Sequence, residues 1–224
     1  MQNMISKMAR MYPLFIVMGF MIVLIAFIVG YINSQAAAAY FAESKLIRET
    51  TLMVQRASIE SVGLWMPPFK FLGIGFILSG IVMALRVIIE NLIGAGKEVL
   101  SNLPSEKRPQ MPNPPWFANL MPIVMMLGLV IFLVAFGVGL WLSGIAGDVF
   151  ANPLPTIDTA GAGSSLLAGV QTIHSVEGWL VPLKFFAIST EFLAIMMGLA
   201  TIIFILESQI KLLDGTLKSS KAAS

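Results

Sequence analysis

The chain has 224 residues, of which 57% are hydrophobic and 12% are charged, and its formal net charge is +2. A soluble globular domain is nearer half apolar and a quarter charged, so this composition indicates a membrane protein. Cysteine is absent, which excludes disulfides, thiolate metal sites and cysteine nucleophiles. The basic residues are dispersed along the chain, so no nucleic-acid surface is predicted.

Four apolar segments are long enough to cross a hydrocarbon layer of about 30 Å as helices, at about 1.5 Å per residue. They span about residues 13–32, 65–89, 122–142 and 179–206. Helices satisfy their own backbone hydrogen bonds in lipid, and no alternating strand pattern competes with them in the sequence. The sequence therefore predicts an all-α integral membrane protein with four transmembrane helices.

The second half of the chain repeats the first. The segment 13–30 aligns with 122–139, and the identical pairs include Pro13/Pro122, Gly19/Gly128, Ala26/Ala135 and Gly30/Gly139. At a second offset, the identical pairs include Trp65/Trp179, Pro68/Pro182 and Lys70/Lys184. Matched Pro, Gly, Trp and Lys positions are hard to obtain from apolar composition alone. We predict two tandem two-helix repeats, residues 1–93 and 118–213, which enter the membrane in the same direction and are therefore parallel.

The basic residues favour one orientation in the membrane. They gather near the N-terminus, in the linker between the repeats and towards the tail (residues 214–224), at Lys7, Arg10, Lys97, Lys107, Arg108, Lys211, Lys218 and Lys221. The segment 143–177 has no Lys or Arg. By the positive-inside rule we expect both termini on the cytoplasmic side of a prokaryotic cytoplasmic membrane. The first apolar segment is too long for a typical signal peptide, so we expect a retained anchor.

The segments that connect the predicted helices differ in character. Residues 34–62 lack Gly and Pro and are rich in helix formers, so this outer loop should be helical. Its counterpart, residues 143–177, begins with turn signals, and a short helix is expected to restart near Ser164 and to run through Val176. The cytoplasmic linker, residues 94–117, is rich in proline and should be extended.

Pairs of small residues four positions apart recur on each predicted helix. They occupy equivalent places in the two repeats: Ala26 with Gly30, Ala135 with Gly139, Gly80 with Ala84, and Ala194 with Gly198. Small residues let helix backbones approach closely where lipid supplies no hydrophobic drive for association. We interpret these pairs as packing seams within the chain, with contact between subunits as the alternative.

A Trp-x-x-Pro-x-Lys element marks the expected outer starts of the second and fourth helices. Trp prefers the membrane interface, Pro is tolerated in a first helical turn, and Lys can extend its ammonium group to the headgroups. We interpret the Trp and Lys residues as interfacial anchors or lipid contacts, namely Trp65, Lys70, Trp179 and Lys184. In the alternative, the two lysines flank a central vestibule or hold an anionic lipid.

Glu191 is the most costly residue to place, because it falls about halfway along the fourth predicted helix. Lys184 lies on the same helical face two turns earlier, and Ser189 and Thr190 are adjacent to Glu191. These four residues form a candidate intramembrane polar site. It serves either a structural contact, within the chain or with a neighbouring subunit, or the binding of a proton or ion.

His174 is the only histidine, so a metal site of several imidazoles is excluded, and we expect it to be solvated or interfacial. The sequence shows no catalytic constellation, cofactor motif or metal-binding cluster. We therefore expect a non-catalytic membrane subunit that stabilises or helps assemble a larger membrane complex, such as a respiratory or other redox enzyme. Its partners would be lipids and other membrane subunits, or further copies of itself. A small channel or transporter with Glu191 in the path is the alternative, and a membrane enzyme that uses His174 and Glu191 is a third hypothesis.

Overall fold

The structure is a computed structural model that describes residues 7, 9–101 and 112–222, and these residues contain helices and no strand. Four helices are long: α2 (Tyr12–Ala42), α4 (Met53–Ser101), α5 (Phe117–Phe150) and α7 (Ser165–Ala222). Each has a stretch long and apolar enough to cross a membrane. The prediction of an all-α chain with four such helices is confirmed. Residues 102–111 of the predicted linker, including Lys107 and Arg108, lie outside the described residues.

The helices extend well beyond the apolar segments. α4 starts at Met53 instead of near residue 65 and continues to Ser101, and α7 starts at Ser165 instead of near residue 179. Helix growth is cooperative, so an apolar segment that has formed a helix carries polar neighbours with it. As a result, Pro68 and Pro182 lie inside α4 and α7 and not in a first turn, and residues 94–101 of the linker are helical and not extended.

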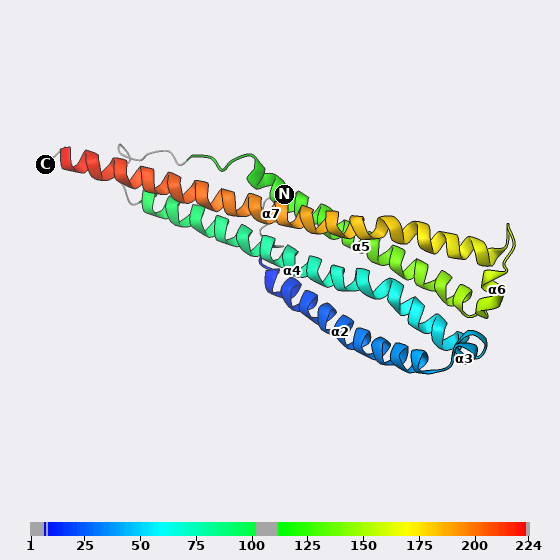
Figure 1. Cartoon of the computed structure of the whole chain (residues 1–224). Helices are drawn as coiled ribbons and strands as arrows, with labels where there is room; N and C mark the ends of the chain where they lie inside the picture. Colours follow the sequence, from blue (N-terminus) through cyan, green and yellow to red (C-terminus); the bar gives the residue numbers. More distant parts are fainter. Residues whose placement is uncertain (1–6, 8, 102–111, 223–224) are drawn as a thin grey trace. The chain divides into compact units, whose positions relative to one another are not determined.

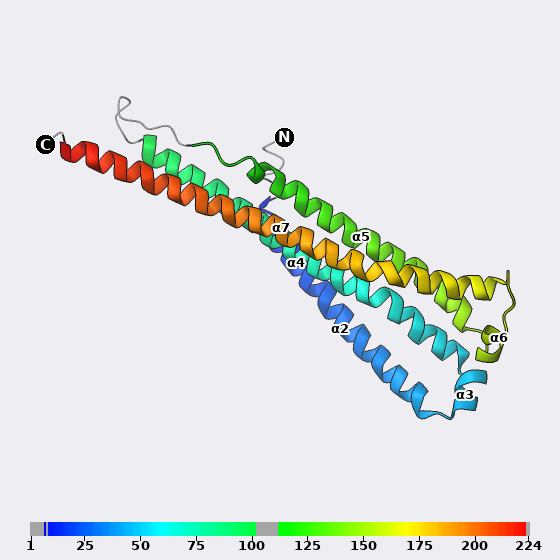
Figure 2. The same ribbon diagram turned by 45° about the horizontal axis from the view of Figure 1, so that its top comes forward.

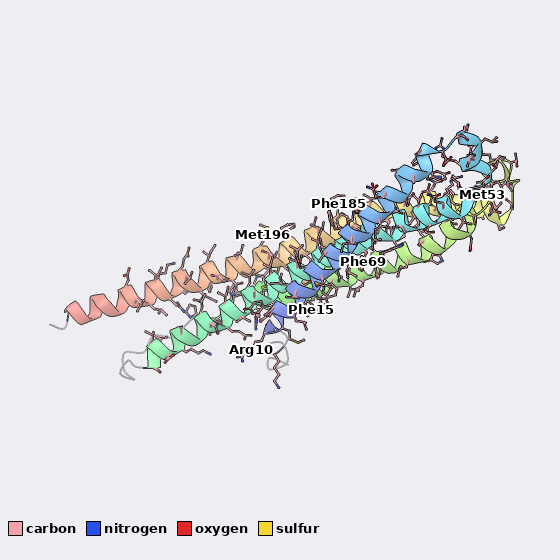
Figure 3. The ribbon with its side chains drawn as sticks, turned by 90° about the horizontal axis from the view of Figure 1, so that it is seen from below. Arg10, Phe15, Met53, Phe69, Phe185 and Met196 are labelled. Atoms are coloured by element: carbon pink, nitrogen blue, oxygen red, sulfur yellow. The ribbon has the colours of Figure 1, made fainter. Side chains whose placement is uncertain are left out.

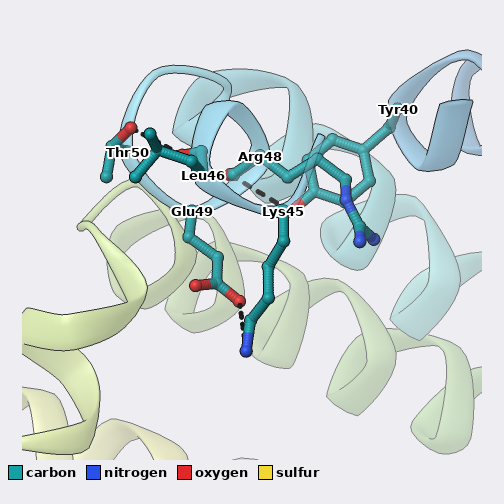
Figure 4. A network of polar contacts seen from close by, with 6 residues as sticks. All are labelled: Tyr40, Lys45, Leu46, Arg48, Glu49 and Thr50. Atoms are coloured by element: carbon teal, nitrogen blue, oxygen red, sulfur yellow. Dashed lines mark hydrogen bonds and ion pairs between the residues drawn. The ribbon is translucent and has the colours of Figure 1, made fainter. Parts of the chain in front are cut away.

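Residues 34–62 are helical apart from short breaks, because α2 continues to Ala42 and α3 (Lys45–Thr50) precedes α4. The Ser44 side chain caps α3 and accepts a hydrogen bond from the Ile47 backbone N–H at 3.4 Å. Figure 4 shows three further contacts around α3. Tyr40 Oη of α2 donates to Arg48 O at 3.3 Å. Within α3, Thr50 Oγ1 donates to Leu46 O at 2.7 Å and Lys45 forms an ion pair with Glu49 at 3.7 Å.

The corresponding segment of the second half is less helical. A short helix, α6 (Leu154–Asp158), follows α5 and contacts α3. Gly163 then adopts a φ of 83°, a left-handed conformation that suits glycine. The Ser164 hydroxyl accepts a hydrogen bond from Leu167 N–H at 3.3 Å, so α7 begins where a helix is predicted to restart. This helix does not end at Val176 but continues to Ala222.

The chain forms two compact units, and each takes stretches from all four long helices. Unit 1 comprises residues 1–16, 78–127 and 190–224, and unit 2 comprises residues 17–77 and 128–189. The core of unit 1 contains Val82, Met83, Ile89, Met121, Met125, Ala194 and Ile205. The core of unit 2 contains Leu64, Ala135, Leu142, Ala146, Ile173 and Leu180. Within unit 2, α2 lies beside α4 in both Figure 1 and Figure 2.

Large apolar side chains also lie on the outside of the helices. Figure 3 labels two of them on α7, Phe185 and Met196, whose side chains are exposed. Contiguous exposed apolar surface is rare on soluble monomers, whereas lipid is an apolar solvent for it. The outer surface therefore agrees with helices that stand in a membrane.

Candidate functional site

The predicted small-residue seams lie close to neighbouring helices. A Cβ atom on Gly80 would lie 2.6 Å from Ile16 Cγ1, one on Gly139 would lie 2.8 Å from Pro68 Cγ, one on Gly198 would lie 2.9 Å from Leu85 Cδ1, and one on Gly30 would lie 3.2 Å from Met66 Cε. Three of the alanines are fully buried, namely Ala26, Ala135 and Ala194, and Ala84 is half-buried. These residues thus allow helices to approach within the chain.

Two glycines outside the predicted seams make a tighter contact between α2 and α4. A Cβ atom on Gly19 would lie 2.5 Å from Gly73 O, and one on Gly73 would lie 2.8 Å from Val23 Cγ2. Neither glycine has a small residue four positions before or after it in the sequence, so the small-residue spacing did not identify them. The identity of Gly19 with Gly128 in the repeat alignment was the available signal.

A fully buried polar pair lies in unit 1. Ser79 on α4 and Glu191 on α7 are both 0% exposed, and Ser79 Oγ donates a hydrogen bond to Glu191 Oε1 at 3.0 Å. Glu191 Oε2 is also buried and has no hydrogen-bond partner among the described residues. Burial of a carboxyl group is costly unless hydrogen bonds compensate for the lost water. The pair is therefore the strongest candidate for a functional group within the helices.

The other members of the predicted polar site have different surroundings. The Ser189 side chain is exposed and donates to Phe185 O at 2.9 Å on its own helix. Thr190 is buried. Lys184 is also buried, and its ammonium nitrogen lies 5.3 Å from the centre of the Phe71 ring, a cation–π contact. The sequence reasoning missed Ser79, although it is a hydroxyl group in an otherwise apolar stretch of α4.

The two copies of the Trp-x-x-Pro-x-Lys element have unlike environments. Lys70 is exposed and lines a groove of about 480 Å³ between α2 and α4, whereas its counterpart Lys184 is buried. Trp65 is half-buried against Phe69, with ring centres 5.5 Å apart, and Trp179 is exposed. Equivalent residues of the two predicted repeats therefore do not make equivalent contacts.

His174 lies in a different cavity, of about 320 Å³, within unit 2. Charged residues share its lining, namely Arg56, Glu60 and Glu177, and the Arg56 guanidinium carbon lies 4.7 Å from the centre of the Phe150 ring. Glu60 and His174 are equivalent positions of the predicted repeats, so both copies contribute to one cavity. Over the described part of the chain, no group of three or more His, Cys, Asp or Glu side chains is arranged to hold a metal ion.

No protein-family model, curated protein or solved structure matches this chain. Four helices that are long and apolar enough to cross a membrane suggest the class of integral membrane proteins. Within that class, function has to be inferred from the contacts and surfaces of the chain itself.

Proposed function

We propose that the protein is a non-catalytic integral membrane subunit that stabilises or helps assemble a larger membrane complex, such as a respiratory or other redox enzyme. The observation that supports this proposal is an uncovered face of α2. In the repeat alignment, Ala26 of α2 corresponds to Ala135 of α5, and both alanines are 0% exposed. Phe20, however, is 60% exposed, whereas its counterpart Leu129 is 7% exposed.

The next aromatic position along the same helix differs in a similar way. Phe136 on α5 is half-buried against Phe69, with ring centres 5.3 Å apart, whereas its counterpart Phe27 on α2 is exposed. Helix α5 thus presents one apolar face to its surroundings and packs another within the chain. α2 instead leaves the equivalent side chains Phe20 and Phe27 exposed, so it has an apolar face that a helix of another subunit could cover in place of lipid.

The groove between α2 and α4 gives a partner a place to pack. Val23, Phe27, Tyr31 and Ile74 form apolar parts of its lining, and Lys70 contributes a cation. A helix from another membrane subunit would bury Phe20 and Phe27 and place side chains in this groove. Aromatic residues that fill such grooves carry much of the binding energy at protein interfaces.

The test is purification from native membranes in a mild detergent, followed by mass determination of the intact particle. We expect the wild type in a particle larger than its own 24.3 kDa. Alanine substitution of both Phe20 and Phe27 should release the chain, whereas alanine substitution of Val130 and Val134, which are exposed on α5, should not. A monomeric wild type, or equal behaviour of the two double variants, would refute the proposal. Composition of the particle separates a different subunit from a second copy.

A small channel or transporter is the second candidate, and the unpartnered Glu191 Oε2 favours it. A buried carboxyl group with one free oxygen is the usual kind of residue at proton and ion sites in membranes. Reconstituted vesicles test this candidate directly. Ion or proton flux that is abolished by Glu191→Gln and retained in Ser189→Ala would support it, and the absence of flux, or flux unchanged by Glu191→Gln, would exclude it.

A further inference from the structure

A cavity of about 550 Å³ lies in unit 1, between the C-terminal parts of α4 and α7 and the segment that precedes α5. These two helices run side by side there in Figure 1 and Figure 2, and Gln209 Nε2 donates to Leu92 O at 2.8 Å between them. The polar side chains of the lining are Arg86, Glu90, Lys97, Asn113, Asn119 and Ser208. Two cations, one carboxylate and neutral hydrogen-bonding groups therefore face one volume.

Arg86 is held in place by its neighbours and keeps donors for a ligand. Its Nε donates to Glu90 Oε1 at 3.2 Å and its Nη1 donates to Ala118 O at 3.4 Å. The guanidinium group has about five N–H donors in a fixed plane, so these two contacts orient it without using all of them. Its side chain is 17% exposed, which strengthens its interaction with an anion relative to a fully solvated cation.

The charges of the cavity favour an anion. Glu90 is compensated by Arg86, because the two side chains form an ion pair on adjacent turns of α4. Lys97 lies two turns further along α4 and adds a second cation to the lining. Arg and Lys together are the usual partners of phosphate oxygens in proteins.

The rest of the lining is apolar, and it includes Ile89, Ile93, Phe204 and Ile205. On α4 no charged residue lies between Lys70 and Arg86, and charged residues return from Arg86 onward. The cavity therefore lies where the helix would leave the hydrocarbon layer. A ligand that matches both walls carries a phosphate group and a hydrocarbon chain. We infer that this cavity binds the phosphate-bearing headgroup of an anionic membrane lipid, with acyl carbons against the isoleucine and phenylalanine side chains.

Direct binding measurements on the purified full-length chain in detergent test this site. Short-chain phosphatidylglycerol, short-chain phosphatidylcholine and inorganic phosphate are the three probes, and calorimetry is the readout. We expect phosphatidylglycerol to bind more tightly than either other probe. Inorganic phosphate that binds as tightly as phosphatidylglycerol, or phosphatidylcholine that does so, would overturn the assignment to an anionic lipid.

Variants decide whether this cavity is the binding site. Lys97→Gln should weaken phosphatidylglycerol binding about five-fold, the effect of one basic residue on an anionic lipid. Lys211→Gln is the matched control, because Lys211 is an exposed lysine of α7 that does not line the cavity. The affinity of this variant for phosphatidylglycerol should stay within about two-fold of the wild-type affinity. Equal affinities of these two variants would refute the site. Arg86→Gln should weaken binding further, and because Lys97 is exposed the first variant remains informative if this one fails to fold.

Discussion

Replacement of Gly19 by alanine should loosen the contact between α2 and α4. The new Cβ atom would lie 2.5 Å from Gly73 O and 2.8 Å from both Ile77 N and Ile77 Cγ1. Two of these three atoms belong to the backbone, so a rotamer change cannot relieve the contact and the helices have to separate. Overpacking of this kind costs about 1–3 kcal/mol.

Alanine also has a higher helix propensity than glycine, by about 1 kcal/mol, which offsets part of that cost. The net expectation for Gly19→Ala is a loss of up to about 2 kcal/mol in the free energy of unfolding. Gly137 on α5 supplies the matched control, because a Cβ atom there would meet nothing within 4 Å. Gly137→Ala should therefore be neutral or stabilise the protein by up to about 1 kcal/mol.

Both variants can be compared with the wild type by denaturant titration in mixed micelles, with tryptophan fluorescence and circular dichroism as the two probes of unfolding. Coincident transitions by the two probes are needed before a free energy is derived from either. If Gly19→Ala proves as stable as Gly137→Ala, the close approach of α2 to α4 through Gly19 and Gly73 is wrong.

Two further predictions concern the buried pair and the topology. Ser79→Ala should lower the free energy of unfolding by about 1–3 kcal/mol, because Glu191 Oε1 loses its hydrogen-bond donor. Ser189→Ala removes an exposed hydroxyl and should change the free energy of unfolding by less than about 0.5 kcal/mol, so similar losses in the two variants would contradict the buried contact. Single cysteines introduced at Lys97 and Ser164 should react with a membrane-impermeant maleimide from opposite sides of sealed vesicles. The chain has no native cysteine, so any labelling of the protein comes from the introduced residue. Labelling of both positions from one side would contradict the predicted topology.

The apolar segments were predictable because uninterrupted hydrophobic runs have few alternatives to a membrane helix. The start of α7 was also predictable, since Ser164 follows turn signals and has a side chain suited to capping. The helix extensions were predictable only in part. The composition of residues 34–62 indicated a helical segment, but not that residues 53–62 continue without a break into the apolar part of α4. Residues 94–101 are too polar for a hydropathy pattern to include, and their helical state follows from their continuity with an apolar helix.

Contacts between distant residues were beyond the sequence pattern. Ser79 and Glu191 are 112 positions apart, and a serine in a membrane helix ordinarily bonds to its own backbone, so nothing local marked Ser79 as a partner. The cavity beside Arg86 is a similar case. The Arg86–Glu90 spacing indicates only a pair on one helix, and the pair became part of a site through α7 and the segment before α5.

The Ser79–Glu191 hydrogen bond joins two positions at which the predicted repeats differ. At the offset that aligns Trp65 with Trp179, Glu191 corresponds to Ile77 and Ser79 corresponds to Leu193. Each half therefore has a polar residue where the other has an apolar one, and the two polar residues meet. Packing alone would be served as well by apolar residues, because a buried acid lowers stability unless its partners compensate fully. With Oε2 unpartnered among the described residues, that compensation is incomplete, so Glu191 is the residue whose replacement best separates a packing role from a proton- or ion-binding role.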